Sequence, residues 1–242
     1  MPILETQEIS VRFGGHMAVN SVDLSVEAGE ICGLIGPNGA GKTTTFNVIT
    51  GLQAPTRGRI RLDGQDITSL SAHKRARSGI ARTFQRLELF GSLTVRDNVR
   101  TAAELNRTMA RPVGDVADEL LERVGLTGVD NQRADALSTG SARLLELARA
   151  LACTPRVLLL DEPASGLDEG ETDRFADLLM ELARDGLAIL IVEHDVPLVM
   201  RMCDHLTVLN FGEVLASGTP KEIQKNQAVL DAYLGQDPGA PG

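Results

Sequence analysis

The stretch ICGLIGPNGAGKTTTFNVIT, from Ile31 to Thr50, decides the fold of this chain. It opens with a mostly apolar run typical of a strand, continues through a glycine-rich segment, and then takes on helical character near Gly41. Within it, Gly36–Thr43 (GPNGAGKT) matches the phosphate-binding pattern G-x-x-x-x-G-K-[ST] at every defined position. Glycines let the backbone wrap closely around phosphate oxygens. The stretch therefore predicts a strand–loop–helix nucleotide cradle of the P-loop type.

The side chains of this cradle suit a nucleotide triphosphate. Lys42 would place a compact positive charge against the β and γ phosphates, and the Thr43 hydroxyl would complete the shell of a Mg²⁺ ion. A glycine-rich turn with a surface lysine is the alternative interpretation. The residues expected to bind ATP here are Gly36, Pro37, Asn38, Gly39, Ala40, Gly41, Lys42, Thr43 and Thr44.

A second signal lies at 157–160, where an apolar run is followed directly by Asp161 and Glu162. The run is typical of a buried parallel strand, whose carboxyl end is where open α/β sheets bind ligands. We expect Asp161 to hold Mg²⁺ and Glu162 to polarise the water that attacks the γ-phosphate. Alone, an Asp-Glu pair after a strand is also compatible with a solvated loop.

The remaining pattern predicts an α/β fold. Residues 8–13, 22–26 and 57–67 alternate in period two and indicate strands, with a turn region at 13–16 and a tight turn at Asp63-Gly64. Residues 94–124 are helical in pattern, with a break at Arg111-Pro112. Beyond them, helices and apolar strands alternate, which predicts a parallel sheet covered by helices. The expected elements are helices at 141–152, 171–184 and 196–203, and strands at 157–161, 187–192, 205–210 and 213–217.

Composition narrows the function classes. The net charge of −9 argues against nonspecific nucleic-acid binding, which requires a cationic surface. The basic run HKRARSGIAR contains Lys74, Arg75, Arg77 and Arg82, and most of these charges are interpreted as belonging to a solvated helix followed by a strand. The three cysteines lie far apart, no apolar run is long enough to span a membrane, and the first ten residues lack the features of a signal peptide. Together these features favour a cytoplasmic protein.

The stretch ALSTGSARLLELARAL, from Ala136 to Leu151, poses a question. Small polar residues and a glycine open a helix, which would make a second anion site through its amides and its dipole. A small domain that already has one phosphate cradle has no evident use for another.

With the cradle, the Asp-Glu strand end and LSTGS in that order, the chain resembles the ATP-binding subunit of an ABC transporter from Leu4 to Gly235. The resemblance implies a P-loop NTPase domain at 1–235 with an antiparallel β subdomain and a small α-helical subdomain at about 86–135. The segment 236–242 is expected to be a flexible tail.

The same resemblance assigns further residues. Gln85 would touch Mg²⁺ and the attacking water, and His194 would contact the γ-phosphate. Asp168 would lie in the loop that follows the Asp-Glu pair, and Phe13 would stack on adenine. Each residue has an ordinary alternative: a surface glutamine, a strand-end histidine, or a core phenylalanine.

The resemblance also answers the question of the second anion site. Two subunits of this family dock head to tail, and Ser138 and Gly140 would grip the γ-phosphate held by the other subunit. Here Thr139 replaces a glycine and Ser141 replaces a glutamine of the usual LSGGQ signature. Such a departure is compatible with slow turnover or with pairing to a different ATPase subunit.

Several stretches, among them GIARTFQ and VEHDVPLVMRMCDHLTVLNFGEVLASGTPKEI, resemble the ATPases of branched-chain amino acid importers. The resemblance implies a second ATPase subunit and transmembrane permease subunits, with membrane contact only through the permease at the cytoplasmic face. Leu87, Leu89, Phe90 and Leu93 would form the groove for a permease helix, or else pack in the core.

Other functions remain open at this point. Urea import and lipopolysaccharide export ATPases share much of the pattern. A soluble ABC ATPase acting in DNA repair or on the ribosome is disfavoured by the acidic composition and the single cradle, and a small-molecule P-loop kinase by LSTGS and His194.

Overall fold

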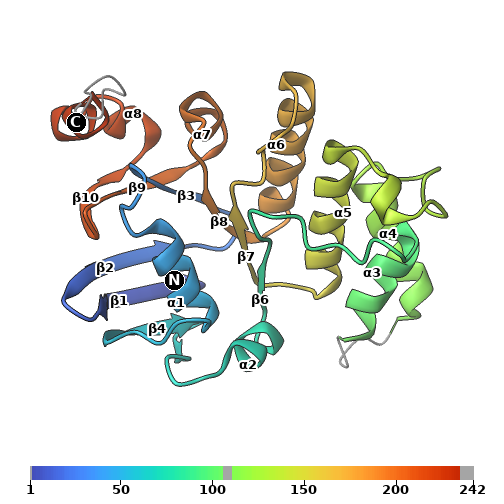
Figure 1. The fold of residues 1–242 in the computed structure, drawn as a ribbon, viewed down its shortest axis with the longest axis horizontal. Helices are drawn as coiled ribbons and strands as arrows, with labels where there is room; N and C mark the ends of the chain where they lie inside the picture. Colours follow the sequence, from blue (N-terminus) through green and yellow to red (C-terminus); the bar gives the residue numbers. More distant parts are fainter. Residues whose placement is uncertain (1, 106–110, 235–242) are drawn as a thin grey trace.

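The computed structural model describes residues 2–105 and 111–234. The tail expected at 236–242 lies outside these residues. The described chain contains two sheets. The smaller sheet and α1 (Lys42–Thr50) lie on one side of the larger sheet, and α5 (Thr139–Ala152) and α6 (Glu169–Arg184) lie on the other (Figure 1).

The larger sheet carries the strand that leads into the cradle. Its order is β10-β9-β3-β8-β7-β6, and all its strands are parallel except β10, which runs antiparallel to β9. The carboxyl ends of the parallel strands therefore share one edge, where α/β sheets bind ligands. The strands are β3 (Ile31–Ile35), β6 (Ile80–Arg82), β7 (Val157–Asp161), β8 (Ala188–Val192), β9 (His205–Asn210) and β10 (Glu213–Gly218).

The smaller sheet is antiparallel, as expected from the period-two pattern. Its order is β2-β1-β4-β5, with β1 (Leu4–Phe13), β2 (His16–Val26), β4 (Arg57–Leu62) and β5 (Gln65–Asp66). Asp63 and Gly64 have φ angles of 51° and 74°, so the tight turn between β4 and β5 is confirmed.

The central strands are buried on both faces, and this explains their continuous apolar sequences. Along β7, Val157 and Leu159 pack toward the smaller sheet and α1, whereas Leu158 and Leu160 pack toward the helical layer. The same alternation runs through β3 and β8. Each fully buried Leu or Ile contributes about 1.5–3 kcal/mol, so this two-sided core holds the edge that carries the site in a fixed shape.

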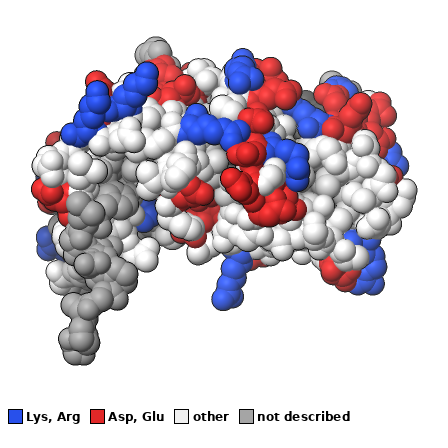
Figure 2. Space-filling view, turned by 90° about the horizontal axis from the view of Figure 1, so that it is seen from above, with Lys and Arg blue, Asp and Glu red and all other residues white. Residues whose placement is uncertain are grey.

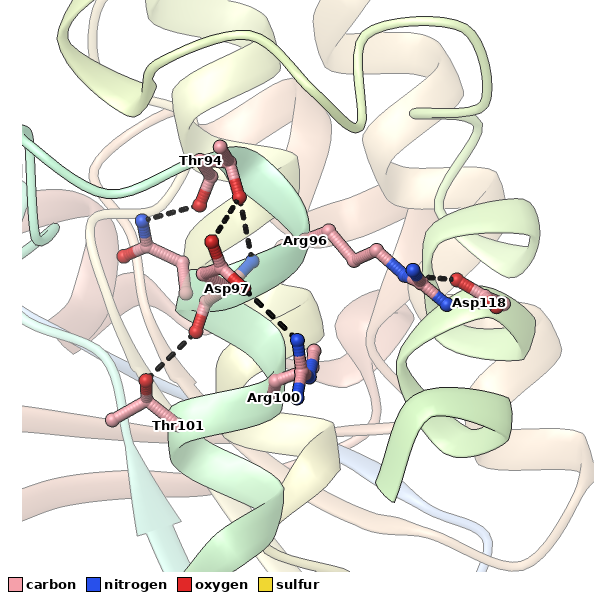
Figure 3. A network of polar contacts seen from close by, with 7 residues as sticks. Thr94, Arg96, Asp97, Arg100, Thr101 and Asp118 are labelled. Carbon is pink, nitrogen blue, oxygen red and sulfur yellow. Dashed lines mark hydrogen bonds and ion pairs between the residues drawn. The ribbon is translucent and has the colours of Figure 1, made fainter. Parts of the chain in front are cut away.

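Residues 83–138 connect β6 to α5 through α3 (Val95–Glu104), α4 (Val113–Arg123) and a short 3₁₀ helix (Ala134–Ala136). The Thr94 hydroxyl caps α3 by accepting from the Asp97 amide at 3.0 Å. Arg96 on α3 donates to both carboxylate oxygens of Asp118 on α4, at 2.7 and 2.6 Å (Figure 3). Both helices pack on α5 through their buried faces.

Two helices begin earlier than the sequence pattern suggests. α5 begins at Thr139 rather than at residue 141, because the Ser138 side chain caps it. α6 begins at Glu169 rather than at residue 171, because Asp168 and Glu171 form a capping box. The shorter helices are α2 (Ala72–Arg77), α7 (Val196–Met202), α8 (Pro220–Ile223) and α9 (Gln227–Leu234).

The interpretation of the basic run as solvated is wrong for two of its residues. Lys74 and Arg77 are exposed, but Arg75 is buried and donates to four backbone carbonyls, including those of Val48 and Ile49 at the end of α1. Arg82 is also withdrawn from solvent and forms an ion pair with Asp161. Both side chains are held by contacts distant in sequence, which the local charge pattern does not reveal.

The surface shows no dominant basic field on the face seen in Figure 2, where acidic and basic side chains are interspersed. Within residues 2–105 and 111–234, none of the helices combines the length and apolar character needed to cross a bilayer.

Candidate functional site

The cradle (Gly36–Thr43) lies at the carboxyl edge of the larger sheet, between β3 and α1. Gly36, Gly39 and Gly41 have φ angles of 148°, 79° and 103°, which side-chain-bearing residues rarely adopt. A Cβ atom at Gly36 would stand 2.1 Å from the Leu209 carbonyl oxygen, and one at Gly41 would stand 2.7 Å from that of Ala18. The loop is therefore packed tightly between neighbouring backbones and requires glycine at these positions.

The Lys42 side chain folds back over the cradle. Its Nζ donates to the carbonyl oxygens of Gly36 at 2.6 Å and Pro37 at 2.9 Å. An ammonium group has three donors, so one donor is not used by these two bonds. Burial lowers the pKa of Lys42, while the nearby carboxylates of Glu162 and Asp161 oppose that shift. The ammonium thus lies in a partly desolvated position, where its attraction to phosphate oxygens is strengthened.

The start of α1 is arranged to receive an anion. Gly41 caps the helix without any side-chain hydrogen bond, and no acidic residue lies in the first turn. The first amides of a helix have no intrahelical acceptor, so they remain available to phosphate oxygens. The Thr43 side chain is exposed on this turn and Thr44 is half-buried, as binding of a ligand and its metal requires.

Asp161 and Glu162 stand at the end of β7, next to the cradle. Asp161 is buried and accepts from Arg82 Nη2 at 2.8 Å, and Arg82 Nη1 donates to the Asn47 side chain on α1 at 2.6 Å. Glu162 has a φ of 48°, and its amide donates to the Val192 carbonyl of β8 at 2.8 Å. The pair is thus fixed to the sheet and is not a mobile solvated loop.

Three of the expected catalytic side chains converge. Gln85 Nε2 donates to Glu162 Oε2 at 2.8 Å, and His194 Nδ1 lies 3.9 Å from the same carboxylate oxygen. The His194 side chain is 70% exposed, so it is not a satisfied core histidine. Glu162 thus lies close to Gln85, which is 77 residues before it in the sequence, and to His194, which is 32 residues after it.

Buried ionic groups that the sequence pattern did not single out hold these side chains. Arg143 and Glu146 on α5 form a buried pair at 3.0 Å, and Arg143 also donates to the Gln85 carbonyl at 2.7 Å. Glu193 accepts from the amides of Ala164 at 2.8 Å and His194 at 3.3 Å. Burial raises the pKa of both Glu146 and Glu193. An Arg and a Glu at i,i+3 spacing on an otherwise apolar helix face is a signal that could have revealed the first pair.

The expected second anion site lies at the starts of α5 and α6. Ser138 caps α5, accepting from the Ser141 amide at 3.3 Å, and Asp168 caps α6 with Glu171. Gly140 is packed against Glu171, whose Oε1 would lie 2.2 Å from an added Cβ. Among the described residues, Ser138, Gly140 and Asp168 thus gather around the starts of α5 and α6. These two helices lie on the side of the larger sheet opposite to α1, the helix that follows the cradle.

The exposed fractions decide whether Phe13 is a core residue, and they separate the members of the apolar cluster that follows Gln85. Phe13 ends β1 with 50% of its surface exposed, so it is not a core residue. In the apolar cluster after Gln85, Leu87 and Phe90 are exposed, and the Arg149 guanidinium lies over the Phe90 ring at 4.7 Å. Leu89 instead packs partly against the core.

The donor set fits magnesium bound together with a nucleotide. Thr43, Gln85 and Asp161 offer hydroxyl, amide and carboxylate oxygens, the hard ligands that Mg²⁺ prefers. The described residues contain no cluster of three or more His, Cys, Asp or Glu suited to a metal ion. Mg²⁺ characteristically takes one or two carboxylates and completes its shell with waters and substrate phosphates, and the residues present match that habit.

The sequence profile of the ABC transporter family matches residues 19–165, and that of the branched-chain amino acid ATP-binding cassette transporters matches residues 213–238. The chain is 45% identical to the high-affinity branched-chain amino acid transport ATP-binding protein BraF of Pseudomonas aeruginosa, covering 97% of this chain and 98% of that protein. It is 41% identical, with the same coverage, to LivG of Escherichia coli, which bears the same description. The lipopolysaccharide export ATP-binding protein LptB of Haemophilus influenzae is 35% identical over 98% of both chains.

Solved structures agree with the fold. The crystal structure of a nucleotide-free ATP-binding cassette from an ABC transporter superposes with a TM-score of 0.88 at 31% identity, covering 98% of this chain and 100% of that one. A cassette in its ADP conformation gives the same TM-score at 30% identity, with the same coverage. A dimeric cassette in a post-hydrolysis state with ADP and phosphate gives 0.80 at 26% identity, covering 90% and 98%.

Proposed function

The chain belongs to the ABC transporter family, and from that membership we propose that it powers the import of branched-chain amino acids by hydrolysing ATP. The family and its solved members make the chain an ATP-binding ATPase of the P-loop type. The convergence of Gln85 and His194 on Glu162, beside the Lys42 cradle, is the observation that carries the chemistry.

In the proposed reaction, the cradle binds the β and γ phosphates through its amides and through Lys42. Glu162 accepts a hydrogen bond from the attacking water and takes its proton as the water oxygen bonds to the γ-phosphorus. The bond from that phosphorus to the β–γ bridging oxygen breaks, and ADP leaves. Gln85 orients the carboxylate and the water, and His194 donates to the γ-phosphate. Thr43, Gln85 and Asp161 would hold a Mg²⁺ ion, which would supply neutralising charge at the phosphate oxygens.

A second ATPase subunit completes the proposed site. Ser138 and Gly140 lie at the start of α5, which is on the opposite side of the larger sheet from α1, and a dipole end of this kind suits phosphate. We assign them to the γ-phosphate held by the partner subunit, with Asp168 at the same interface. ATP would then favour the closed pair, because only the closed pair makes contacts on both sides of it. The dimeric structure of a related cassette supports such pairing.

The proposed role in amino acid import is supported by the sequence similarity to known transport ATPases. BraF and LivG exceed LptB in identity to this chain, and the match at 213–238 is to the branched-chain amino acid group. We propose transmembrane permease subunits as partners, contacted through the exposed Leu87 and Phe90 of the 86–135 segment. The protein would lie at the cytoplasmic face of the membrane, touching it only through the permease.

The first test removes the cradle lysine. We expect Lys42→Ala to abolish ADP and ATP binding in titration calorimetry, since the variant loses the charge that faces the phosphates. Lys225→Ala, which removes an exposed lysine in the turn after α8, is the matched control and should bind like the parent. Robust binding by Lys42→Ala would overturn the assignment of the cradle.

The transport role is tested in the source cell. Deletion of the chain should abolish uptake of radiolabelled leucine, and the Lys225→Ala variant should restore it whereas Lys42→Ala should not. Unchanged leucine uptake after deletion would remove the amino acid import proposal while leaving the ATPase assignment in place.

A further inference from the structure

The turn between β9 and β10 presents an aromatic side chain to solvent. Phe211 is 86% exposed, the largest exposed fraction among the big apolar residues of the described chain. It has a φ of 46° and is followed by Gly212 with a φ of 83°, and the pairing of Asn210 with Glu213 leaves these two residues as the whole turn. Asn-Gly is the favoured sequence for such a turn, because positive φ suits asparagine better than phenylalanine. An aromatic residue here is neither needed for the core nor favoured by the backbone.

This turn is attached directly to the phosphate-binding cradle. The Gly212 amide donates to the Ala40 carbonyl at 3.0 Å, and the Gly212 carbonyl accepts from the Asn20 amide of β2 at 2.8 Å. The Asn20 side chain donates to Glu213 Oε1 at 2.7 Å. The backbone that carries Phe211 is thus fixed in position relative to the loop that binds the phosphates.

The strand order places Phe211 at the end of the nucleotide site that is remote from Glu162 and His194. β3 leads into the cradle. Its neighbour β8 leads to His194, and β7, the next strand in the sheet, leads to Glu162. β9 is the neighbour of β3 on the other side, and its carboxyl end opens the turn that holds Phe211. A nucleotide whose γ-phosphate points to Glu162 must therefore extend its sugar and base away from β8, on the side of β9.

The hairpin of β1 and β2 reaches the same place. The Ala18 carbonyl of β2 stands 2.7 Å from the Cβ position of Gly41 and 2.8 Å from that of Gly212. Two residues before Ala18, His16 pairs across the hairpin with Phe13. In Figure 1 the outer ends of the β1–β2 and β9–β10 hairpins lie on the same side of the molecule. Two exposed aromatic residues, Phe13 and Phe211, therefore flank the end of the cradle remote from Glu162.

We propose that Phe211 contacts the adenine base or its ribose when a nucleotide is bound, so that the base lies between two aromatic side chains. The inference rests on the proposed binding of ATP by the cradle. Every base has an apolar face that gains by stacking on an aromatic ring in place of water. The competing occupant of this surface is the second ATPase subunit, and the experiments below separate the two.

The chain has no tryptophan, so Phe211→Trp would carry the sole indole fluorophore. We expect ADP to quench or shift its emission, because the base would stack on the indole. Tripolyphosphate, which offers phosphates without a base, should leave the emission unchanged. The control is Leu52→Trp, also at an exposed position (56%), which follows the far end of α1. Emission from Leu52→Trp should not respond to ADP.

The affinity of Phe211→Ala supplies the second readout. We expect titration calorimetry to show ADP binding weakened about fivefold or more, since stacking is lost. Tripolyphosphate binding should be unchanged, and Leu52→Ala should bind ADP like the parent.

Three results would overturn the inference. One is a fluorescence emission of Phe211→Trp that does not change at saturating ADP. Another is an ADP affinity of Phe211→Ala that lies within about twofold of that of the parent. A third is unaltered ADP affinity with loss of ATP-dependent pairing of subunits, which would assign Phe211 to the partner instead. Failure of the parent protein to bind ADP would overturn the proposed function itself, and the inference with it.

Discussion

At the scale of single residues, the site depends on carboxylates that differ in their surroundings. Asp161 is buried against Arg82, whereas Glu162 is partly open and shared between Gln85 and His194. Asp161 is thus a fixed negative group, suited to a cation. Glu162 can face a water molecule, which suits a general base.

We predict that Glu162→Gln retains ATP binding but hydrolyses ATP about a hundredfold or more slowly than the parent. Glutamine has nearly the same shape and can still interact with Gln85, but it cannot take the proton from water. Steady-state phosphate release and calorimetry measure the two properties. Turnover equal to that of the parent would show that another group is the base.

Glu193 gives a prediction about pH. Burial raises its pKa in the folded protein, so its contribution to stability is complete below the unfolded-state pKa and is lost as pH rises through the raised folded-state pKa. Glu193→Gln keeps an acceptor for the Ala164 amide and carries no charge. The unfolding free energy of the variant, relative to that of the parent, should therefore increase as the pH rises from about 4.5 to about 7. The lower limit is close to the pKa of glutamate in an unfolded chain. A constant difference in urea unfolding across this range would contradict the burial argument.

At the scale of elements, the local sequence predicted most of the architecture. The apolar runs of β7 and β8 and the positive-φ turn at Asp63-Gly64 are local signals, and the strands from β7 to β10 lie within one residue of their expected ranges. The starts of α5 and α6 were placed too late, because apolar periodicity begins after the capping residues Ser138 and Asp168.

The contacts between elements could not be predicted in the same way. Arg82 meets Asp161 from 79 residues away, and Arg143 meets the Gln85 carbonyl from 58 residues away. Partners so distant leave no pattern in a single sequence. The cradle and Glu162 were therefore found from motifs, whereas the residues that hold them in place required the structure.

The contact between α5 and α6 yields a prediction about stability. Gly140→Ala should lower the unfolding free energy by about 1 kcal/mol, because the new methyl group would displace Glu171 from its cap on α6. In a Glu171→Ala background the same change should cost much less. Urea unfolding of the parent, the two single variants and the double variant completes the cycle.

Gly114→Ala is the matched control for that cycle. Gly114 lies in the first turn of α4, and the nearest atom to an added Cβ there, on Arg96, is at an ordinary 3.7 Å. Alanine should therefore be neutral or stabilise the protein by up to about 1 kcal/mol. An equal loss from Gly140→Ala in both backgrounds would contradict the role assigned to Glu171.

At the scale of the whole molecule, the proposed anion sites at the cradle and at the start of α5 point to an assembly of two subunits. The cradle stands at the carboxyl edge of the sheet beside Glu162, and the start of α5 lies against α6 with Thr139 next to Gly166. We propose that one chain supplies both halves of the site, each to a different nucleotide. Two chains in head-to-tail arrangement would join each cradle to the Ser138–Gly140 segment of the other, and hydrolysis would release them.

The most direct test is the structure of the Glu162→Gln protein with magnesium and ATP, supplemented with its natural ATPase mate if it pairs with a different subunit. We predict that Ser138 and the amide of Gly140 in one subunit lie within hydrogen-bonding distance of the γ-phosphate in the cradle of the other. An ATP-loaded cradle with Ser138 facing solvent in every subunit would contradict the shared site.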